Sequence, residues 1–126
     1  MSKQRIIICG WPNSGKSGRA EELSSKLGIP VRHTDSLIRT MGWSEVSETV
    51  SRWFDEPGPW IIEGVAVPRA LRKWRARNPN TDDVPFDRLI VMPEPEPEGM
   101  KPGQVSMGRG HDTVLKQLEE WIGGYL

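Results

Sequence analysis

Apolar residues along the chain gather in two kinds of segment, short continuous runs and longer stretches with helical spacing. The continuous runs are typical of strands buried in a parallel sheet, and they lie within Arg5–Cys9, Trp60–Glu63 and Asp87–Met92. Ile29–Thr34 is predicted as a further, short strand. The stretches with helical spacing lie at Gly15–Leu27, Asp35–Thr40, Ser44–Phe54, Pro68–Arg77 and from about Asp112 to Ile122. This alternation predicts an α/β protein, a three-layer α/β/α sandwich around a parallel sheet of about four or five strands.

One segment departs from this alternation. Residues 93–103 read PEPEPEGMKPG, and proline stiffness would hold such a segment extended and solvated. We expect residues 93–110 to form either a connecting loop or a short lid over a site. The whole chain of 126 residues is expected to make one domain, because it is long enough for one core and too short for two.

The charge balance and composition narrow the classes of partner. Lys plus Arg and Asp plus Glu each number 17, so the chain has no overall attraction to nucleic acid or to an anionic membrane. No apolar run approaches the roughly 20 residues that span a bilayer, and the charged start leaves no room for a signal peptide. Cys9 is the single cysteine, which excludes an intramolecular disulfide. We therefore expect a cytoplasmic protein without a membrane partner.

The strongest motif follows the first predicted strand. Residues 10–17 read GWPNSGKS and satisfy the pattern G-x-x-x-x-G-K-[ST] in full. Gly10 and Gly15 let the backbone turn its N–H groups toward phosphate oxygens, and the helix that follows adds its positive end. Lys16 would neutralise the β- and γ-phosphates, and the Ser17 hydroxyl would bind Mg²⁺. The motif therefore predicts a phosphate-binding loop for a nucleoside triphosphate.

All eight residues of this loop are candidate nucleotide contacts: Gly10, Trp11, Pro12, Asn13, Ser14, Gly15, Lys16 and Ser17. Trp11 is the unusual member. Its ring could stack on a ligand, but packing against the outside of the loop is the favoured interpretation.

Other motifs exclude the common large classes of triphosphate-binding protein. A GTPase needs D-x-x-G after a strand, whereas the one match, Asp55–Gly58, follows a helical stretch. The guanine-reading motif N/T-K-x-D is absent from the sequence. The strand ending in Asp or Asp-Glu that marks AAA-type ATPases and helicases is also missing.

With those classes excluded, the sequence resembles the small P-loop kinases, in particular the nucleoside monophosphate kinases and the shikimate kinase relatives. RHTDSLI, residues 32–38, is similar to the shikimate kinase segment D-x-D followed by an apolar pair, with Asp35 as its second acid. WIIEGVAVPRAL, residues 60–71, resembles the monophosphate kinase segment that ends in Asp-Gly-Phe-Pro-Arg, with two extra residues between its ends. The resemblance implies ATP as phosphate donor, Mg²⁺ as metal, and a small acceptor such as a nucleotide or nucleoside. The family's fifth core strand and arginine-rich lid have no counterpart in this sequence.

Four side chains outside the loop are candidates for phosphoryl-transfer chemistry. Asp35 would orient or deprotonate the acceptor, or else cap the helix that it begins. Glu63 would support Mg²⁺ with Ser17, or else serve as a structural carboxylate at a strand end. By the resemblance, Arg69 would hold the acceptor phosphate. Arg109, between two glycines in SMGRGHD, could swing over the γ-phosphate as a lid arginine does.

The remaining titratable residues favour plainer interpretations. His33 is expected to be a hydrogen-bonded packing residue, and His111 a capping or surface residue. The helix that carries Arg69 also holds further basic residues that are typical of a solvated face: Arg72, Lys73, Arg75 and Arg77. Because such a basic helix could instead follow a nucleic-acid backbone, a polynucleotide 5′-hydroxyl kinase is an alternative to the small-acceptor kinase. A non-catalytic ATP-binding regulatory module is the second alternative.

Overall fold

The computed structural model describes residues 4–96 and 98–126. Its strands are β1 (Arg5–Cys9), β2 (Val31–His33), β3 (Trp60–Glu63) and β4 (Arg88–Val91). Its helices are α1 (Lys16–Leu27), α2 (Asp35–Ile38), α3 (Trp43–Trp53), α4 (Val67–Arg77), α5 (Pro102–Gln117) and α6 (Glu119–Ile122), with a final 3₁₀ turn at Gly123–Tyr125. β1 and β3 have the bounds that the hydrophobic pattern predicts, whereas β2 and β4 are shorter.

The four strands form one parallel sheet in the order β2-β3-β1-β4. Each connection between neighbouring parallel strands crosses through a helical segment, as parallel pairing requires. In register, Ile8 of β1 lies opposite Glu63 of β3, and Cys9 lies opposite Val91 of β4. The carboxyl ends of all four strands therefore meet at one edge of the sheet, where ligands bind in open α/β folds.

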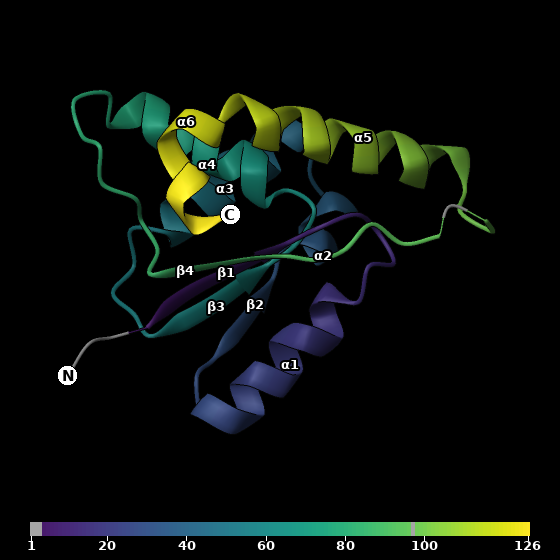
Figure 1. Cartoon of the computed structure of the whole chain (residues 1–126), viewed down its shortest axis with the longest axis horizontal. Coiled ribbons are helices and arrows are strands. Elements are labelled where there is room, and N and C mark those ends of the chain that lie inside the picture. The colour runs from purple at the N-terminus through teal and green to yellow at the C-terminus, as the bar shows by residue number, and fades with distance from the viewer. Residues whose placement is uncertain (1–3, 97) are drawn as a thin grey trace.

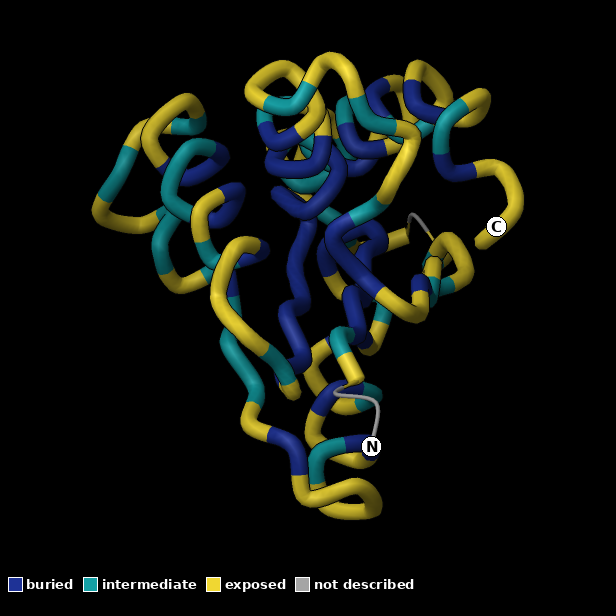
Figure 2. Tube along the Cα trace, turned by 90° about the vertical axis from the view of Figure 1, so that its left-hand side faces the viewer, coloured by how far each residue is buried: buried dark blue, intermediate teal, exposed yellow. Residues whose placement is uncertain are grey.

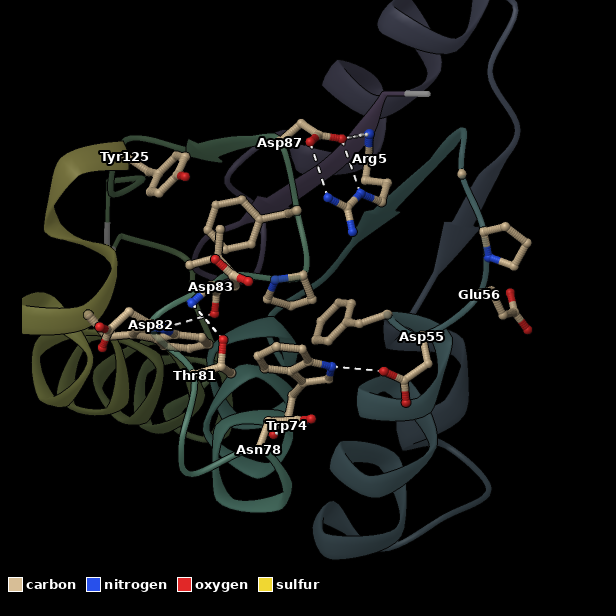
Figure 3. Close-up of a pocket in the computed structure, with 17 residues that line it drawn as sticks. Arg5, Asp55, Glu56, Trp74, Asn78, Thr81, Asp82, Asp83, Asp87 and Tyr125 are labelled. Atoms are coloured by element: carbon tan, nitrogen blue, oxygen red, sulfur yellow. Dashed lines mark hydrogen bonds and ion pairs between the residues drawn. The ribbon is translucent and has the colours of Figure 1, made fainter. Parts of the chain in front are cut away.

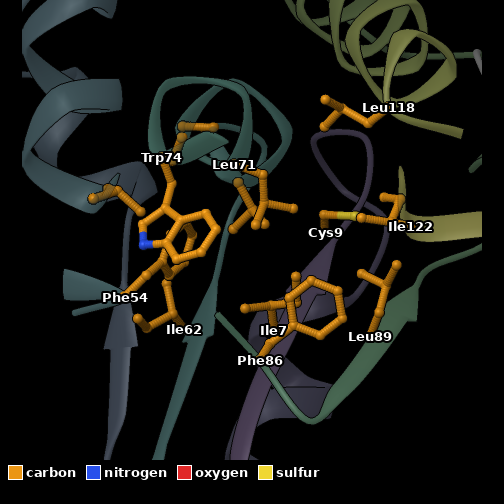
Figure 4. Close-up of a cluster of buried hydrophobic side chains, with 14 of the residues drawn as sticks. Ile7, Cys9, Phe54, Ile62, Leu71, Trp74, Phe86, Leu89, Leu118 and Ile122 are labelled. Carbon is orange, nitrogen blue, oxygen red and sulfur yellow. The ribbon is translucent and has the colours of Figure 1, made fainter. Parts of the chain in front are cut away.

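Helices cover both faces of the sheet. α1 lies on one face, and α3, α4, α5 and α6 lie on the other (Figure 1). Ile6 and Ile8 pack with α1, whereas Ile7 and Cys9 pack in the larger cluster on the opposite face (Figure 4). β1 is accordingly buried on both faces, and Figure 2 shows buried, dark blue segments through the middle of the molecule. The predicted three-layer α/β/α sandwich is confirmed.

The start of the last long helix was predicted wrongly. The apolar pattern placed it at about Asp112, but α5 begins at Pro102. Proline is well suited to a first helical position, and the Lys101 N–H donates to Gln104 Oε1 at 3.0 Å across the first turn. The glycines that follow hid this helix in the sequence. Residues 102–110 are thus helical, and the connecting segment after β4 ends at Lys101.

Within residues 4–96 and 98–126, no helix combines the length and apolarity that crossing a membrane requires.

Candidate functional site

The loop after β1 has the backbone of a phosphate-binding turn. Asn13 and Gly15 have positive φ values of 62° and 85°, and α1 begins directly afterward at Lys16. A side chain at Gly10 would lie 2.7 Å from Ser14 Oγ and 3.0 Å from Met92 Cβ. Glycine is therefore required at position 15 by its conformation and at position 10 by close packing. The loop leaves the N-terminal end of α1 open toward the carboxyl edge of the sheet.

Lys16 and Asp35 form an ion pair beside this loop. Lys16 is 5% exposed, and its Nζ lies 3.2 Å from Asp35 Oδ2 while also donating to the Trp11 carbonyl at 3.2 Å. Asp35 Oδ1 accepts the N–H of Val65, just after β3, at 3.0 Å. The helix that Asp35 begins has no side-chain cap. The Asp35 carboxylate therefore faces the P-loop lysine and the loop after β3, and the helix-cap interpretation does not describe it.

Glu63 lies at the end of β3, fully buried, beside Ser17 and His33. Its Oε1 accepts from Ser17 Oγ at 3.3 Å and lies 2.8 Å from His33 Nδ1, and its Oε2 has no hydrogen-bond partner. Burial raises the pKa of Glu63, and the hydrogen bond from His33 opposes this shift. The Ser17 hydroxyl and the Glu63 carboxylate predicted as metal ligands are thus neighbours.

His33 links this carboxylate to a second one at the surface. Its Nε2 lies 2.9 Å from Glu21 Oε1 on α1, so each ring nitrogen faces a carboxylate oxygen. Partial burial lowers the pKa of His33, but hydrogen bonds to Glu63 and Glu21 outweigh it and the net shift is upward. Two ionised carboxylates can only accept, so a hydrogen bond to each of them requires a proton on both ring nitrogens. His33 is hydrogen-bonded, as the sequence interpretation held, but its partner is the candidate metal ligand.

Trp11 connects the P-loop to α5. A side chain at Gly108 would overlap the Trp11 ring, so the helix and the indole touch only because position 108 lacks a Cβ. The indole Nε1–H donates to Asp112 Oδ2 at 2.9 Å, and Trp11 is 6% exposed. The ring therefore packs beneath α5 on the outside of the loop, which was the favoured interpretation of the sequence.

The same helix changes the interpretation of Arg109. The glycines on either side of it do not make a flexible hinge, because they lie within α5 and contact other residues. Gly108 faces Trp11, and a side chain at Gly110 would lie 2.6 Å from Arg69 Nη2. Arg109 itself is exposed. Its role above the γ-phosphate stays a prediction, but the premise that glycines free it to swing is wrong.

Arg69 lies where α4 meets α5 and α3. Its guanidinium stacks on Trp43 at 4.4 Å from the ring centroid, and its Nη1 is buried without a hydrogen-bond partner. Burial lowers the pKa of Arg69, and the neighbouring charge of Arg72 adds to this. Arg69 is therefore a cation held in place by packing, without a carboxylate in ion-pair distance among the described residues.

His111 was predicted to cap a helix or lie at the surface, and this was wrong. It is 1% exposed within α5, its Nδ1 lies 2.9 Å from Asp112 Oδ1, and its Nε2 has no partner. Burial lowers the pKa of His111, the Asp112 carboxylate opposes this, and the charges of Lys16 and Arg69 reinforce it. Placing the helix start near Asp112 made His111 look like a terminal residue. Only the longer helix puts it inside.

Buried polar atoms without partners are concentrated around this site. Within the described part of the chain they are Ser14 Oγ, Glu63 Oε2, Arg69 Nη1 and His111 Nε2. All four belong to the P-loop, to the end of β3, or to the α4–α5 contact beside them. Since buried polar groups are normally hydrogen-bonded, this cluster makes the region a candidate site for polar ligands or water.

The basic residues of α4 are engaged in local contacts. Their partners are Gln117 for Arg72, Ser44 for Lys73, the Trp121 ring for Arg75, and Asp55 with Ser51 for Arg77. These contacts are typical of a solvated helix face.

A cavity of about 900 Å³ lies elsewhere in the molecule (Figure 3). Arg5, at the start of β1, and Asp87, just before β4, form part of its lining and pair at 3.1 Å. Because parallel strands all begin at the same edge, this cavity is at the opposite end of the sheet from the P-loop. Its size alone does not make it the catalytic site.

Comparison with known proteins gives a likeness in structure. No protein-family profile and no curated protein matches the sequence. Among solved structures, shikimate kinase from Bacteroides thetaiotaomicron is similar, with a TM-score of 0.50 and 14% identity over 98% of this chain and 82% of that one. The resemblance suggested by the sequence is thus confirmed for the fold: the chain has a P-loop kinase fold.

Proposed function

We propose that this protein is an ATP-dependent P-loop phosphotransferase acting on a small acceptor, with a nucleotide or nucleoside as the favoured class. One observation carries the proposal. The P-loop lysine, Lys16, lies 3.2 Å from Asp35, a carboxylate outside the loop at the carboxyl edge of the sheet. This arrangement sets a phosphate-neutralising cation beside a group that can receive a proton.

The residues present fit Mg²⁺ and a triphosphate. Ser17 and Glu63 offer hydroxyl and carboxylate oxygens, the donors that Mg²⁺ prefers, and Glu63 Oε2 is a buried acceptor without a partner. Ser14 Oγ and the loop N–H groups offer donors to phosphate oxygens. Mg²⁺ bound at Ser17 and Glu63 would neutralise phosphate charge and orient the triphosphate.

The protein's own groups then have distinct tasks. Lys16 would stabilise charge on the transferred phosphoryl group. Asp35, held by the Val65 N–H, would orient the acceptor hydroxyl or take its proton. His33 would keep the Glu63 carboxylate directed at Ser17. Of the alternatives, nucleic acid is the less favoured acceptor, because the basic side chains of α4 other than Arg69 are engaged in local contacts.

The test is Mg·ATP binding and phosphate transfer from labelled ATP across a panel of nucleotides, nucleosides and other small acceptors. A charge-assisted contact contributes roughly 1.5–3 kcal/mol, so Lys16→Ala should lower affinity or turnover about 10- to 100-fold. Lys26→Ala, which removes an exposed lysine from the same helix, is the matched control and should change neither.

Unchanged binding and turnover in the Lys16→Ala variant would overturn the P-loop assignment. Binding of ATP by the wild-type protein without transfer to any acceptor would instead favour the regulatory module.

A further inference from the structure

The cavity of about 900 Å³ lies apart from the candidate catalytic site, and the proposed function does not use it. Segments that are far apart in the sequence build its wall (Figure 3). They are the start of β1, the turn after α3, the end of α4, the stretch between α4 and β4, and the end of the chain. A volume of this size is typical of a small-molecule site, since such pockets usually enclose about 300–1,000 Å³.

Hydrogen bonds and ring stacking hold this wall in place. The Trp74 indole donates to Asp55 Oδ1 at 2.9 Å, which ties α4 to the turn after α3. The Trp121 indole donates to the Asp83 carbonyl at 3.2 Å, which ties α6 to the stretch before β4. The two indole rings also stack, with 5.9 Å between their centroids. The cavity is therefore built by elements that are already connected to one another.

Aromatic rings supply much of the apolar lining. They belong to Phe54, Trp74, Phe86, Trp121 and Tyr125. The face of an aromatic ring attracts a cation, because the ring quadrupole places negative charge there. One of these rings already contacts a cation, since the Arg75 guanidinium lies 5.1 Å from the centroid of the Trp121 ring. A lining of this kind suits a ligand that joins apolar carbon to positive charge.

Carboxylates dominate the charged part of the lining. The single guanidinium of Arg5 stands against five carboxylates, those of Asp55, Glu56, Asp82, Asp83 and Asp87. Arginines pair with three of the five, and Arg5 itself is one of these partners. Within the described part of the chain, Asp82 and Asp83 form no ion pair. The two charges that remain repel nucleotides and attract cations.

We propose that this cavity binds a small organic dication, in which amine or guanidine groups are joined by a short carbon chain. Its charged groups would lie against Asp82 and Asp83, and its carbon chain against the rings of Trp121 and Tyr125. A metal dication is not the expected occupant, because no group of three or more His, Cys, Asp or Glu side chains among the described residues could hold one. The proposal does not depend on the proposed function, since the cavity and the P-loop lie at opposite ends of β1.

The test is a calorimetric titration of the protein at low ionic strength with putrescine and with agmatine. Butanediol, which has the carbon chain of putrescine without its charges, is the neutral control. Magnesium chloride at equal ionic strength is the control for a metal dication and for screening. Putrescine and agmatine should each bind saturably at one site, and neither control should.

Variants then locate the site. Replacing Asp82 and Asp83 together by asparagine should raise the Kd of both amines about 2- to 30-fold, the range for two exposed ion pairs. The matched control replaces Glu45 and Glu94 by glutamine, which removes two exposed carboxylates outside the cavity and should leave the Kd unchanged.

A second pair of variants tests the aromatic contact. Tyr125 is 45% exposed, so its replacement removes little of the core. Tyr125→Leu keeps an apolar side chain but loses the ring, and it should raise the Kd about 2- to 30-fold, whereas Tyr125→Phe should bind nearly as the wild type does.

Absence of saturable binding by either amine would overturn this inference. Equal affinity of the wild type and the variant without Asp82 and Asp83 carboxylates would overturn it as well. Butanediol binding as tightly as putrescine would show an apolar cavity without charge selectivity, and magnesium binding as tightly would show a metal site; each result contradicts an organic dication. None of these titrations requires nucleotide, so their outcome is separate from that of the proposed function.

Discussion

Replacing Gly108 with alanine would place a methyl group where the Trp11 ring already lies. The obstacle is an indole held by Asp112 beneath α5, which cannot rotate away as the end of a flexible side chain could. Overpacking of this kind costs about 1–3 kcal/mol. Alanine in place of a glycine within a helix raises the unfolding free energy by about 0.5–1 kcal/mol. The net expectation is a loss of about 0–2.5 kcal/mol of unfolding free energy.

Two other glycines of α5 are matched controls for this substitution. A side chain at Gly103 would meet nothing within 4 Å, so Gly103→Ala should stabilise the protein by up to about 1 kcal/mol. A side chain at Gly110 would meet only the end of Arg69, at 2.6 Å, so Gly110→Ala should displace that guanidinium at little cost in stability.

The assay is urea unfolding of the three variants and the wild type, followed by affinity for an ATP analogue. Gly108→Ala should also weaken nucleotide binding, because the displaced ring is part of the phosphate loop. Equal stability of the Gly103→Ala and Gly108→Ala variants would refute the packing of Trp11 on α5. Loss of stability without any change in nucleotide affinity would refute the coupling between α5 and the loop.

Four further outcomes follow from the candidate site, from the buried Cys9 and from the charged surface. Asp35→Asn should slow phosphate transfer about 100-fold or more with little change in Mg·ATP binding, and transfer at the wild-type rate would show that Asp35 does not act on the acceptor. Glu63→Gln should instead raise the Mg²⁺ concentration that transfer requires. Burial raises the pKa of Cys9 to about 12, so its thiol should react with an alkylating reagent far more slowly in the native than in the unfolded protein near neutral pH, and equal rates would contradict its burial. The hydrogen bond from Arg5 lowers the pKa of Asp87 below 3.8. Asp87→Asn should therefore lower the unfolding free energy by its full amount above pH 3.8, and by less as the pH falls through the lowered pKa. A loss that does not depend on pH would show that the pair is not formed.

Local patterns determined much of this protein. The strand at Arg5–Cys9 was predicted with the right bounds, and residues 10–15 form a turn directly before a helix as the motif predicts, because a buried strand and a glycine-lysine motif are written in consecutive residues. The alternation of strands and helices predicted the layers for the same reason. Glu63 and Asp35 could be placed at the carboxyl edge because each lies at or just after the end of a predicted strand.

Only the tertiary structure decided what α5 does. Its glycines suggested a loop because a sequence does not show which atom a side chain would strike, and here they permit contact with Trp11 and Arg69. The same holds for His111, whose burial depends on a helix packed against α4 and the loop after β1. The spacing of residue types along the chain predicts the secondary structure of each segment. Whether a buried polar atom has a hydrogen-bond partner depends on residues that are far away in the sequence. The burial of His111 and its unpartnered Nε2 therefore became visible only when the helices were in place.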